Sequence, residues 1–252
     1  MPQFLVSPEE IEGNRFFLQG PEAFHLTRVL RYKEGQSIEV FDGKGGRYSG
    51  VIEAIRADGS VEGRVVGTLH AQHASSSVKL TLYLGLMKAS RWEWALEKGA
   101  EVGVSRFVPV LTPRTVVQLR EGGASKMERW KKILLAASKQ CGRADIPEIR
   151  PAALFRDAVQ EACGAGLTLL GWEKMPKKST SPPLHGALAR SQGKGEVGVS
   201  LFIGPEGGFS EEEVELAEME GAHLFHLGSS TLRGETAAIV ASALVLYELG
   251  AL

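Results

Sequence analysis

The spacing of apolar and polar residues between positions 15 and 66 is that of short strands. Apolar positions alternate with polar ones, and turns that contain glycine, such as DGKGG and ADGS, separate the alternating segments. Alternation with a period of two is typical of strands that bury one face. We therefore predict a small β-barrel whose strands are RFFLQ, SIEVFD, RYSGVIEAI and SVEGRVV.

After residue 79 the pattern changes to apolar runs separated by segments of helical period. Such runs are typical of strands buried on both faces of a parallel sheet, so the pattern predicts an α/β domain. Its expected strands are KLTLYLGLM, RFVPVL, LTLLGW, VGVSLFIG and AHLFHLG. Its expected helices are RWEWALEKGAEVG, segments near 125–141, 154–163 and 183–192, and helices that begin at Ser210 and near Glu235.

The segment HAQHASSS at 70–77 is polar, small and without period, which is typical of a linker. A chain of 252 residues can bury one large core or two modest ones. We therefore predict a first domain over residues 1–72 and a second over residues 73–252.

Charge is unevenly distributed, although the net charge is only −1. Residues 79–150 hold 14 basic and 7 acidic side chains, whereas residues 151–252 hold 7 basic and 13 acidic ones. A basic segment of this kind can attract nucleic-acid phosphates, and solvated helix faces are the alternative explanation.

Neither cysteine use nor hydropathy indicates a secreted or membrane protein. Cys141 and Cys163 are too few for a disulfide framework and lack the spacing of a zinc site. The sequence contains no apolar run of about 20 residues and no basic-then-apolar leader. We expect a cytoplasmic protein that holds no metal and does not associate with a membrane.

The most informative segment is IGPEGGFSEEEVELA at 203–217, where an apolar strand, a glycine-rich turn and a helix follow one another. Ligands of α/β proteins bind at such turns, and Gly207 and Gly208 let backbone amides approach them. Ser210 is predicted to cap the helix, with Glu213 completing a capping box. An ordinary strand-to-helix turn remains the alternative.

The charge of this turn argues against a phosphate ligand. Glu206 and residues 211–213 are all glutamates, and neither a Walker motif nor GxGxxG is present. Phosphate-binding helix N-termini use positive charge, so a nucleoside triphosphate would be repelled here. A cofactor with adenine, ribose and a sulfonium group fits better, which points to S-adenosylmethionine.

A second candidate loop lies in LGSSTLRGETAAIVASALVLYELG at 227–250. Arg233 and Glu235 flank Gly234, so either they pair, or Glu235 serves the helix N-terminus while the guanidinium group faces a ligand. An arginine at a helix N-terminus opposes the helix dipole and needs another partner.

Several segments, in order, resemble the ribosomal RNA small-subunit methyltransferase E family. IGPEGGF and LGSSTLRGETA are similar to its C-terminal signature. FHLTRVLRYKEG with FDGKGGRYSGVI resembles its N-terminal PUA-like RNA-binding barrel, and WALEKGAEVGVSRFVPVLTPRT resembles a helix-strand segment. RWKKILLAASKQCGRADIPEI is similar to a stretch centred on a Gln and an Arg, here Gln140 and Arg143. The chain departs from the family at Gly234, where Thr is frequent, and at 229–231, where SST replaces a more basic loop.

The resemblance implies a SPOUT α/β trefoil-knot domain preceded by a small PUA-like β-barrel. It implies a homodimer with an S-adenosylmethionine pocket at its interface. The implied reaction is methylation of N3 of a uridine in 16S ribosomal RNA, with free small-subunit RNA or the assembling small subunit as partner.

Roles for individual residues follow from this reaction. Loss of the uridine N3 proton leaves an anion that Arg233 could stabilise but not generate, since guanidinium does not deprotonate in proteins. Glu206 or Glu235 could accept the proton. The expected cofactor-binding residues are Leu170, Glu173, Ile203, Gly204, Pro205, Gly207, Gly208, Leu227, Gly228 and Leu232, with the whole strand end from Leu170 to Glu173 beside the pocket.

RNA contacts are expected from basic residues of both domains. These are Arg15, His25, Arg28, Arg31, Lys88, Arg91, Arg114 and Arg143. Trp92 and Trp94 lie two apart on a helix and cannot share a face, so both are expected to pack rather than to stack on bases. A knotted RNA-binding or ribosome-assembly module without activity, and a nucleotide-dependent enzyme, are the competing hypotheses.

Overall fold

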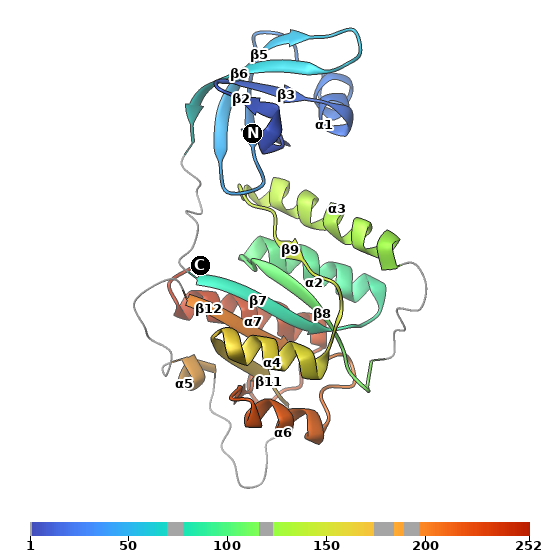
Figure 1. Ribbon diagram of the computed structural model, residues 1–252, viewed down its shortest axis with the longest axis vertical. Coiled ribbons are helices and arrows are strands. Elements are labelled where there is room, and N and C mark those ends of the chain that lie inside the picture. Colours follow the sequence, from blue (N-terminus) through green and yellow to red (C-terminus); the bar gives the residue numbers. More distant parts are fainter. Residues whose placement is uncertain (1, 70–77, 116–122, 174–183, 189–196) are drawn as a thin grey trace. The chain divides into compact units, whose positions relative to one another are not determined.

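The computed structural model describes residues 2–69, 78–115, 123–173, 184–188 and 197–252 (Figure 1). Contacts divide the chain into two compact units. The first comprises Met1–Ser75 and Leu135–Ile146, and the second comprises Ser76–Leu134 and Pro147–Leu252. The predicted linker at 70–77, and with it the predicted boundary after residue 72, lies outside the described residues.

The first unit is built on one six-stranded sheet. Its strands are β1 (Gln3–Leu5), β2 (Ile11–Glu12), β3 (Arg15–Leu18), β4 (Ser37–Phe41), β5 (Arg47–Ile55) and β6 (Val61–Thr68). They run in the order β1-β4-β5-β6-β3-β2, and all pairs except β1 with β4 are antiparallel. The four predicted strands are confirmed as β3 to β6. No pairing closes β1 onto β2 among the described residues, so the described strands form an open sheet where a barrel was predicted.

Three short helical segments complete the sheet unit: η1 (Pro8–Glu10), α1 (Gly20–Phe24) and the π-helix η2 (His25–Val29). Phe16 of β3 is fully buried and lies over two strand glycines. A Cβ atom at Gly50 or Gly63 would lie 2.5 or 2.1 Å from its ring. Glycine in a strand often marks such a close approach.

The second unit has a parallel sheet, as the apolar runs predict. Its strands are β7 (Val78–Gly85), β8 (Arg106–Leu111), β9 (Glu148–Ile149), β10 (Ala153–Leu154), β11 (Leu167–Gly171), β12 (Val197–Ile203) and β13 (His223–Phe225). The order is β10-β8-β7-β12-β11-β13, with β9 beside β8, and every pair is parallel. The two-residue strands β9 and β10 are too short for any sequence pattern to predict.

Helices alternate with these strands. They are α2 (Ala89–Val102), α3 (Gly123–Cys141), α4 (Phe155–Ala165), α5 (Leu184–Leu188), α6 (Glu211–Met219) and α7 (Gly234–Glu248). In Figure 1, α4 lies in front of the sheet and α7 behind it. In agreement, α4 packs against β8, β11, β12 and α6, whereas α7 packs against β7, β12 and α2. No helix among the described residues is long and apolar enough to cross a membrane.

Aromatic side chains fill the core under α4. The rings of Tyr83 and Phe202 stack 4.4 Å apart, and Phe155 meets Phe202 edge-on at 6.0 Å. On α2, Trp92 is buried against Trp130, so the prediction that it packs is confirmed. The same prediction is wrong for Trp94, which is 44% exposed. The helix turns Trp94 to solvent because residues two apart point in different directions.

The predicted capping box at the start of α6 is present. The Glu213 amide donates to Ser210 Oγ at 3.2 Å, and the Ser210 amide donates to Glu213 Oε2 at 2.8 Å. Burial raises the pKa of the Glu213 carboxyl group. The start of α6, and with it the length of the glycine-rich turn, is thus fixed by local interactions.

We expect Ser210→Ala to lower the free energy of unfolding by about 1 kcal/mol, because an orphan helix amide loses its acceptor. Urea denaturation followed by circular dichroism would show a lower midpoint with an unchanged slope. Ser210→Thr keeps a hydroxyl acceptor and should retain most of the stability. An unchanged midpoint for Ser210→Ala would show that the cap contributes nothing.

A second prediction concerns the close approach of β7 to the turn after β12. A Cβ atom at Gly85 would lie 2.3 Å from the backbone nitrogen of Pro205, so Gly85→Ala must displace the turn. We expect a loss of about 1–3 kcal/mol in the free energy of unfolding. The matched control is Gly198→Ala on β12, where an added Cβ meets nothing within 4 Å. Equal urea midpoints for the two variants would contradict the steric explanation.

Candidate active site

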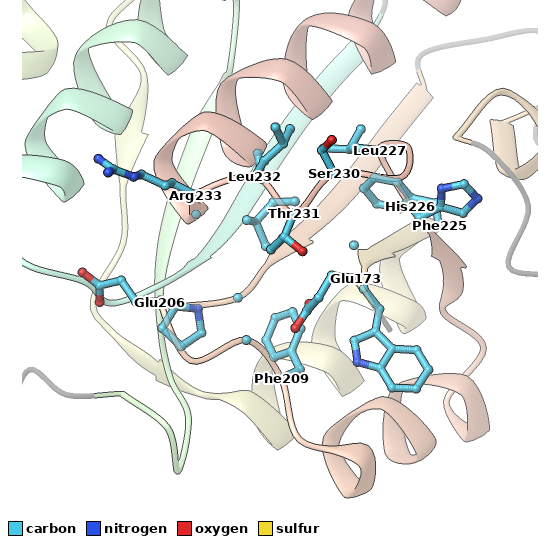
Figure 2. A pocket seen from close by; sticks show the side chains of 18 of the residues that line it. Glu173, Glu206, Phe209, Phe225, His226, Leu227, Ser230, Thr231, Leu232 and Arg233 are labelled. Carbon is cyan, nitrogen blue, oxygen red and sulfur yellow. The ribbon is translucent and has the colours of Figure 1, made fainter. Parts of the chain in front are cut away.

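A cavity of about 320 Å³ opens at the edge of the second unit's sheet where the parallel strands end (Figure 2). Its wall comes from the residues that follow β11, β12 and β13, together with Arg91 of α2 and Ala237 of α7. Carboxyl ends of neighbouring parallel strands lie at one edge of a sheet, which is where α/β proteins bind ligands. The volume is within the range of small-molecule sites.

Most of the residues predicted to bind a cofactor line this cavity. They are Glu173, Ile203, Gly204, Pro205, Gly208, Leu227, Gly228 and Leu232. The other two lie outside its wall. Leu170 is fully buried within β11, and Gly207 lies instead beside Arg114, whose Cβ would be 3.1 Å from a Cβ added at Gly207. The structure therefore brings together two sequence-distant loops that were predicted separately.

The glycine-rich turn is folded tightly and held by a neighbouring arginine. Gly208 has φ +63°, a conformation that favours glycine, and a Cβ there would lie 2.8 Å from Glu173 Oε1. Arg114 donates to the carbonyl oxygens of Gly207 at 3.1 Å and Phe209 at 3.0 Å. Arg114, predicted to contact RNA, thus stabilises the turn in this structure.

Arg91 connects the two candidate loops. Its guanidinium group lies 3.1 Å from Glu206 Oε1 and 3.7 Å from Glu235 Oε1. Of the two arrangements proposed for Arg233 and Glu235, direct pairing is therefore not observed. Glu235 is 8% exposed, and its Oε2 is buried without a hydrogen-bond partner among the described residues.

Arg233 precedes α7 as its N-cap residue, is exposed and lines the cavity. It makes no ion pair with another described residue. Figure 2 shows Arg233 and Glu206 at one end of the cavity and Phe225, His226 and Leu227 at the other. Glu173 and Thr231 lie between these ends. The cavity thus has a charged end and an end rich in ring side chains.

The charges in the wall disfavour a polyphosphate. Glu173 and Glu206 offset Arg91 and Arg233 in the wall, Arg91 is already shared by two carboxylates, and no lysine lines the cavity among the described residues. Polyphosphate sites need the opposite balance. Among the described residues, no group of three His, Cys, Asp or Glu is placed to hold a metal ion.

Sequence reasoning missed several lining residues. These are Phe209, Phe225, His226, Ser230, Thr231, Gly234 and Ala237, and Arg91 was assigned only to RNA. Phe225 and His226 belong to the predicted strand AHLFHLG, and Ser230 and Thr231 follow it closely. This position was the available signal, because strand ends of a parallel sheet converge.

The predicted RNA contacts are distributed over both units. In the first unit, Arg15 pairs with Glu62, and His25 lies half-buried with its ring 6.1 Å from that of Phe4. Arg28 and Arg31 are exposed. Arg143 is 6% exposed and holds Asp145 through two hydrogen bonds of 3.2 and 2.7 Å.

In the second unit, Lys88 is an exposed residue that caps α2. Arg91 and Arg114 belong to the cavity and its turn, as described above. The structure therefore leaves Arg28, Arg31 and Lys88 as the exposed members of the predicted set without an ion pair to a described residue.

Two family models match the chain. Residues 74–246 match an RNA methyltransferase domain, and residues 18–66 match an RNA methyltransferase PUA domain. Both matches agree with the resemblance inferred from the motifs.

Full-length relatives extend the match. The chain is 30% identical to the ribosomal RNA small subunit methyltransferase E of Bacillus subtilis over 94% of this chain and 91% of the relative. It is 30% identical to the Synechocystis protein of that name over 96% and 76%. A Neisseria gonorrhoeae ribosomal RNA small subunit methyltransferase E, solved bound to S-adenosyl methionine, superimposes with a TM-score of 0.84 at 26% identity, covering 98% and 97%. The chain therefore belongs to the ribosomal RNA small subunit methyltransferase E family.

Proposed function

We propose that this protein transfers a methyl group from S-adenosylmethionine to N3 of a uridine in small-subunit ribosomal RNA. The observation that carries the proposal is the cavity in which the glycine-rich turn, Glu173 and Arg233 meet at the ends of the parallel strands. The Neisseria relative that superimposes over nearly the whole chain was solved with this cofactor.

The residues of the cavity fit the cofactor. An adenosyl group needs an apolar wall and backbone groups, which the ring-rich end and residues 203–205 and 227–228 supply. The carboxylates of Glu173 and Glu206 suit a cationic sulfonium group and disfavour a triphosphate. The bound cofactor would supply an electrophilic methyl group.

The protein's own task is to position the uridine and to handle its N3 proton. Arg233 stabilises the negative charge that develops on the carbonyl oxygens beside N3, because its guanidinium group stays charged and has no partner among the described residues. Of the two predicted acceptors, Glu206 lines the cavity and accepts the proton, whereas Glu235 is 8% exposed and is not part of the cavity wall. Arg91 pairs with Glu206 at 3.1 Å and with Glu235 at 3.7 Å, and so orients the Glu206 carboxylate.

A uridine in a helix uses N3 for base pairing, so the target must be unpaired or flipped out to react. The first unit, which matches a PUA domain, supplies an independent grip on the RNA. Arg28 and Arg31 of this unit contribute to it as exposed cations.

A homodimer is part of the proposal, and α7 carries the observation that supports it. Val240, Leu244 and Tyr247 are 36, 41 and 69% exposed and follow one another at helical spacing. Ala237, three residues earlier on the same face, lines the cavity. An exposed apolar stripe marks an interface, and this one runs directly into the cavity. The partner would therefore complete the cofactor site.

The strand order supports a knotted path. β13 pairs with β11, and α7 then returns to pack on β7 and β12. A Cβ atom at Gly234 would lie 3.1 Å from the carbonyl oxygen of Gly204, so the start of α7 passes directly against the turn after β12. After β13 the chain therefore returns past the turn that follows β12. The SPOUT trefoil knot requires such a return.

We expect isothermal titration calorimetry of the purified protein to show binding of S-adenosylmethionine and none of ATP. Arg233→Ala should change this affinity only a few-fold but reduce methylation of unmodified ribosomal RNA by roughly 10²–10³, as removal of a donor to a developing anion does. The matched control is Arg129→Ala, which removes an exposed arginine paired with Glu93 on the second unit's surface.

Two outcomes of this titration would contradict the proposed function. If the folded protein bound no S-adenosylmethionine at millimolar concentration, the methyltransferase hypothesis would be refuted. The alternative hypothesis, a non-catalytic RNA-binding module, would then be favoured. Binding of ATP with comparable affinity would favour the nucleotide-dependent alternative.

We expect Leu244→Glu to convert the dimer to a monomer, because a carboxylate would be buried in the apolar stripe. Light scattering after gel filtration measures the mass, and cofactor affinity should fall with dimer content. Met219→Glu, at an 84% exposed apolar position on α6, is the control and should remain dimeric. A monomeric wild-type protein, or a Leu244→Glu dimer, would refute the assignment of the stripe.

A further inference from the structure

A second cavity, of about 460 Å³, lies on the first unit between α1, η2 and the turn that joins β5 to β6. We call it the Phe24 pocket. Its lining residues are Gln19, Gly20, Phe24, Thr27, Arg28, Ala57, Asp58, Gly59 and Ser60.

Apolar side chains are exposed in and beside this pocket. Phe24 is 62% exposed, and Val29 and Leu30, a few residues on, are 57 and 36% exposed. A phenylalanine at the end of a short helix could have been buried in the nearby core, which holds Ala23 and Leu26. An apolar group rimmed by polar residues is typical of an interaction site.

Two arginines of the same segment are free of ion pairs. The other five arginines of the first unit pair with carboxylates: Arg15 and Arg56 with Glu62, Arg47 with Glu39, Arg64 with Glu53, and Arg143 with Asp145. Arg28, which lines the pocket, and Arg31 pair with no described residue. Their positive charge is thus available to an anionic partner.

The backbone that carries these side chains departs from regular helix. The Leu30 amide donates to the His25 carbonyl oxygen at 2.9 Å, which closes a π-turn, and Arg31 follows at φ +57°. π-turns are frequent at functional sites, and a left-handed arginine is strained where glycine would not be. The segment that supplies Phe24 and Arg28 to the pocket therefore keeps a costly conformation.

Hydrogen-bonding groups complete the rim. Asp58 Oδ1 accepts from the Ser60 amide at 2.9 Å and from Ser60 Oγ at 2.7 Å. These hydrogen bonds lower the pKa of the Asp58 carboxyl group, so it accepts hydrogen bonds and donates none at neutral pH. The Gln19 amide, on the same rim, can donate and accept.

We propose that the Phe24 pocket binds one unpaired RNA nucleobase, stacked on Phe24, with the adjoining phosphates at Arg28 and Arg31. An aromatic face combined with unpaired cations is what single-stranded RNA requires. The proposal rests on the proposed function only in taking RNA as the partner.

The rim further favours guanine. Guanine presents neighbouring N1–H and N2–H donors to Asp58 Oδ2, the oxygen that Ser60 leaves available, and its O6 can accept from Gln19. Uracil presents N3–H between two carbonyl oxygens, which a carboxylate repels. The pocket therefore anchors a nucleotide other than the uridine to be methylated.

Fluorescence anisotropy of the full-length protein with labelled heptamers of uridine, carrying a central guanine, adenine, cytosine or uracil, tests this. We expect the guanine heptamer to bind most tightly and Phe24→Ala to weaken its binding roughly 5- to 150-fold. Phe24→Tyr should restore stacking, and Asp58→Asn should reduce the preference for guanine. Arg28→Gln should weaken binding of every heptamer.

Matched controls lie on the same unit. Val66→Ala changes a 51% exposed apolar residue of β6, and Arg64→Gln removes an arginine that is paired with Glu53. Neither should alter RNA binding more than twofold. As a readout that needs no variant, photo-crosslinking with 6-thioguanosine at the central position should label residues 19–28 or 57–60.

The outcomes separate this inference from the proposed function. If wild type binds RNA and Phe24→Ala binds equally well, or if crosslinks map elsewhere, the pocket is overturned while cofactor binding and methylation stand. If Phe24→Ala loses RNA binding but the wild type binds no S-adenosylmethionine, the pocket stands and the enzyme proposal fails. A preference for uracil would overturn the assignment of the rim.

Discussion

The close approach of the backbone at the end of β7 to the turn after β12 is the constraint on which the candidate active site depends. Gly85 leaves no room for a side chain beside Pro205, and Gly234 is similarly pressed against Gly204. Because backbone meets backbone at both places, the turn and the start of α7 are held together. This contact fixes the turn after β12, which forms the cavity wall together with the residues at the ends of β11 and β13.

Charged side chains then make one end of this cavity different from the other. Arg91 stands between Glu206 and Glu235, at 3.1 and 3.7 Å, and so neutralises two carboxylates at the charged end. Arg114 stabilises the same turn by donating hydrogen bonds to the carbonyl oxygens of Gly207 and Phe209. With these arginines engaged, Arg233 lines the cavity without a described ion-pair partner, as the proposed mechanism requires.

In the first unit, too, ion pairs determine which arginines remain available to a ligand. Most of its arginines are neutralised by neighbouring carboxylates, and the exceptions lie on the strained segment that also exposes Phe24. A domain that binds RNA through one stacked base and two phosphates would hold the substrate without reading the target uridine. Recognition and chemistry would then be assigned to separate units of the chain.

The sequence by itself determined the local structure: the alternating strands of the first unit, the parallel α/β order of the second, and the capping box of Ser210 and Glu213. Periodicity and capping act over a few residues, so a linear pattern contains them. Only the tertiary structure decided that Arg91 joins Glu206, 115 residues away, that Arg143 is buried, and that Trp94 and Phe24 are exposed. Strand order and side-chain partners depend on contacts between distant segments, which no local pattern encodes.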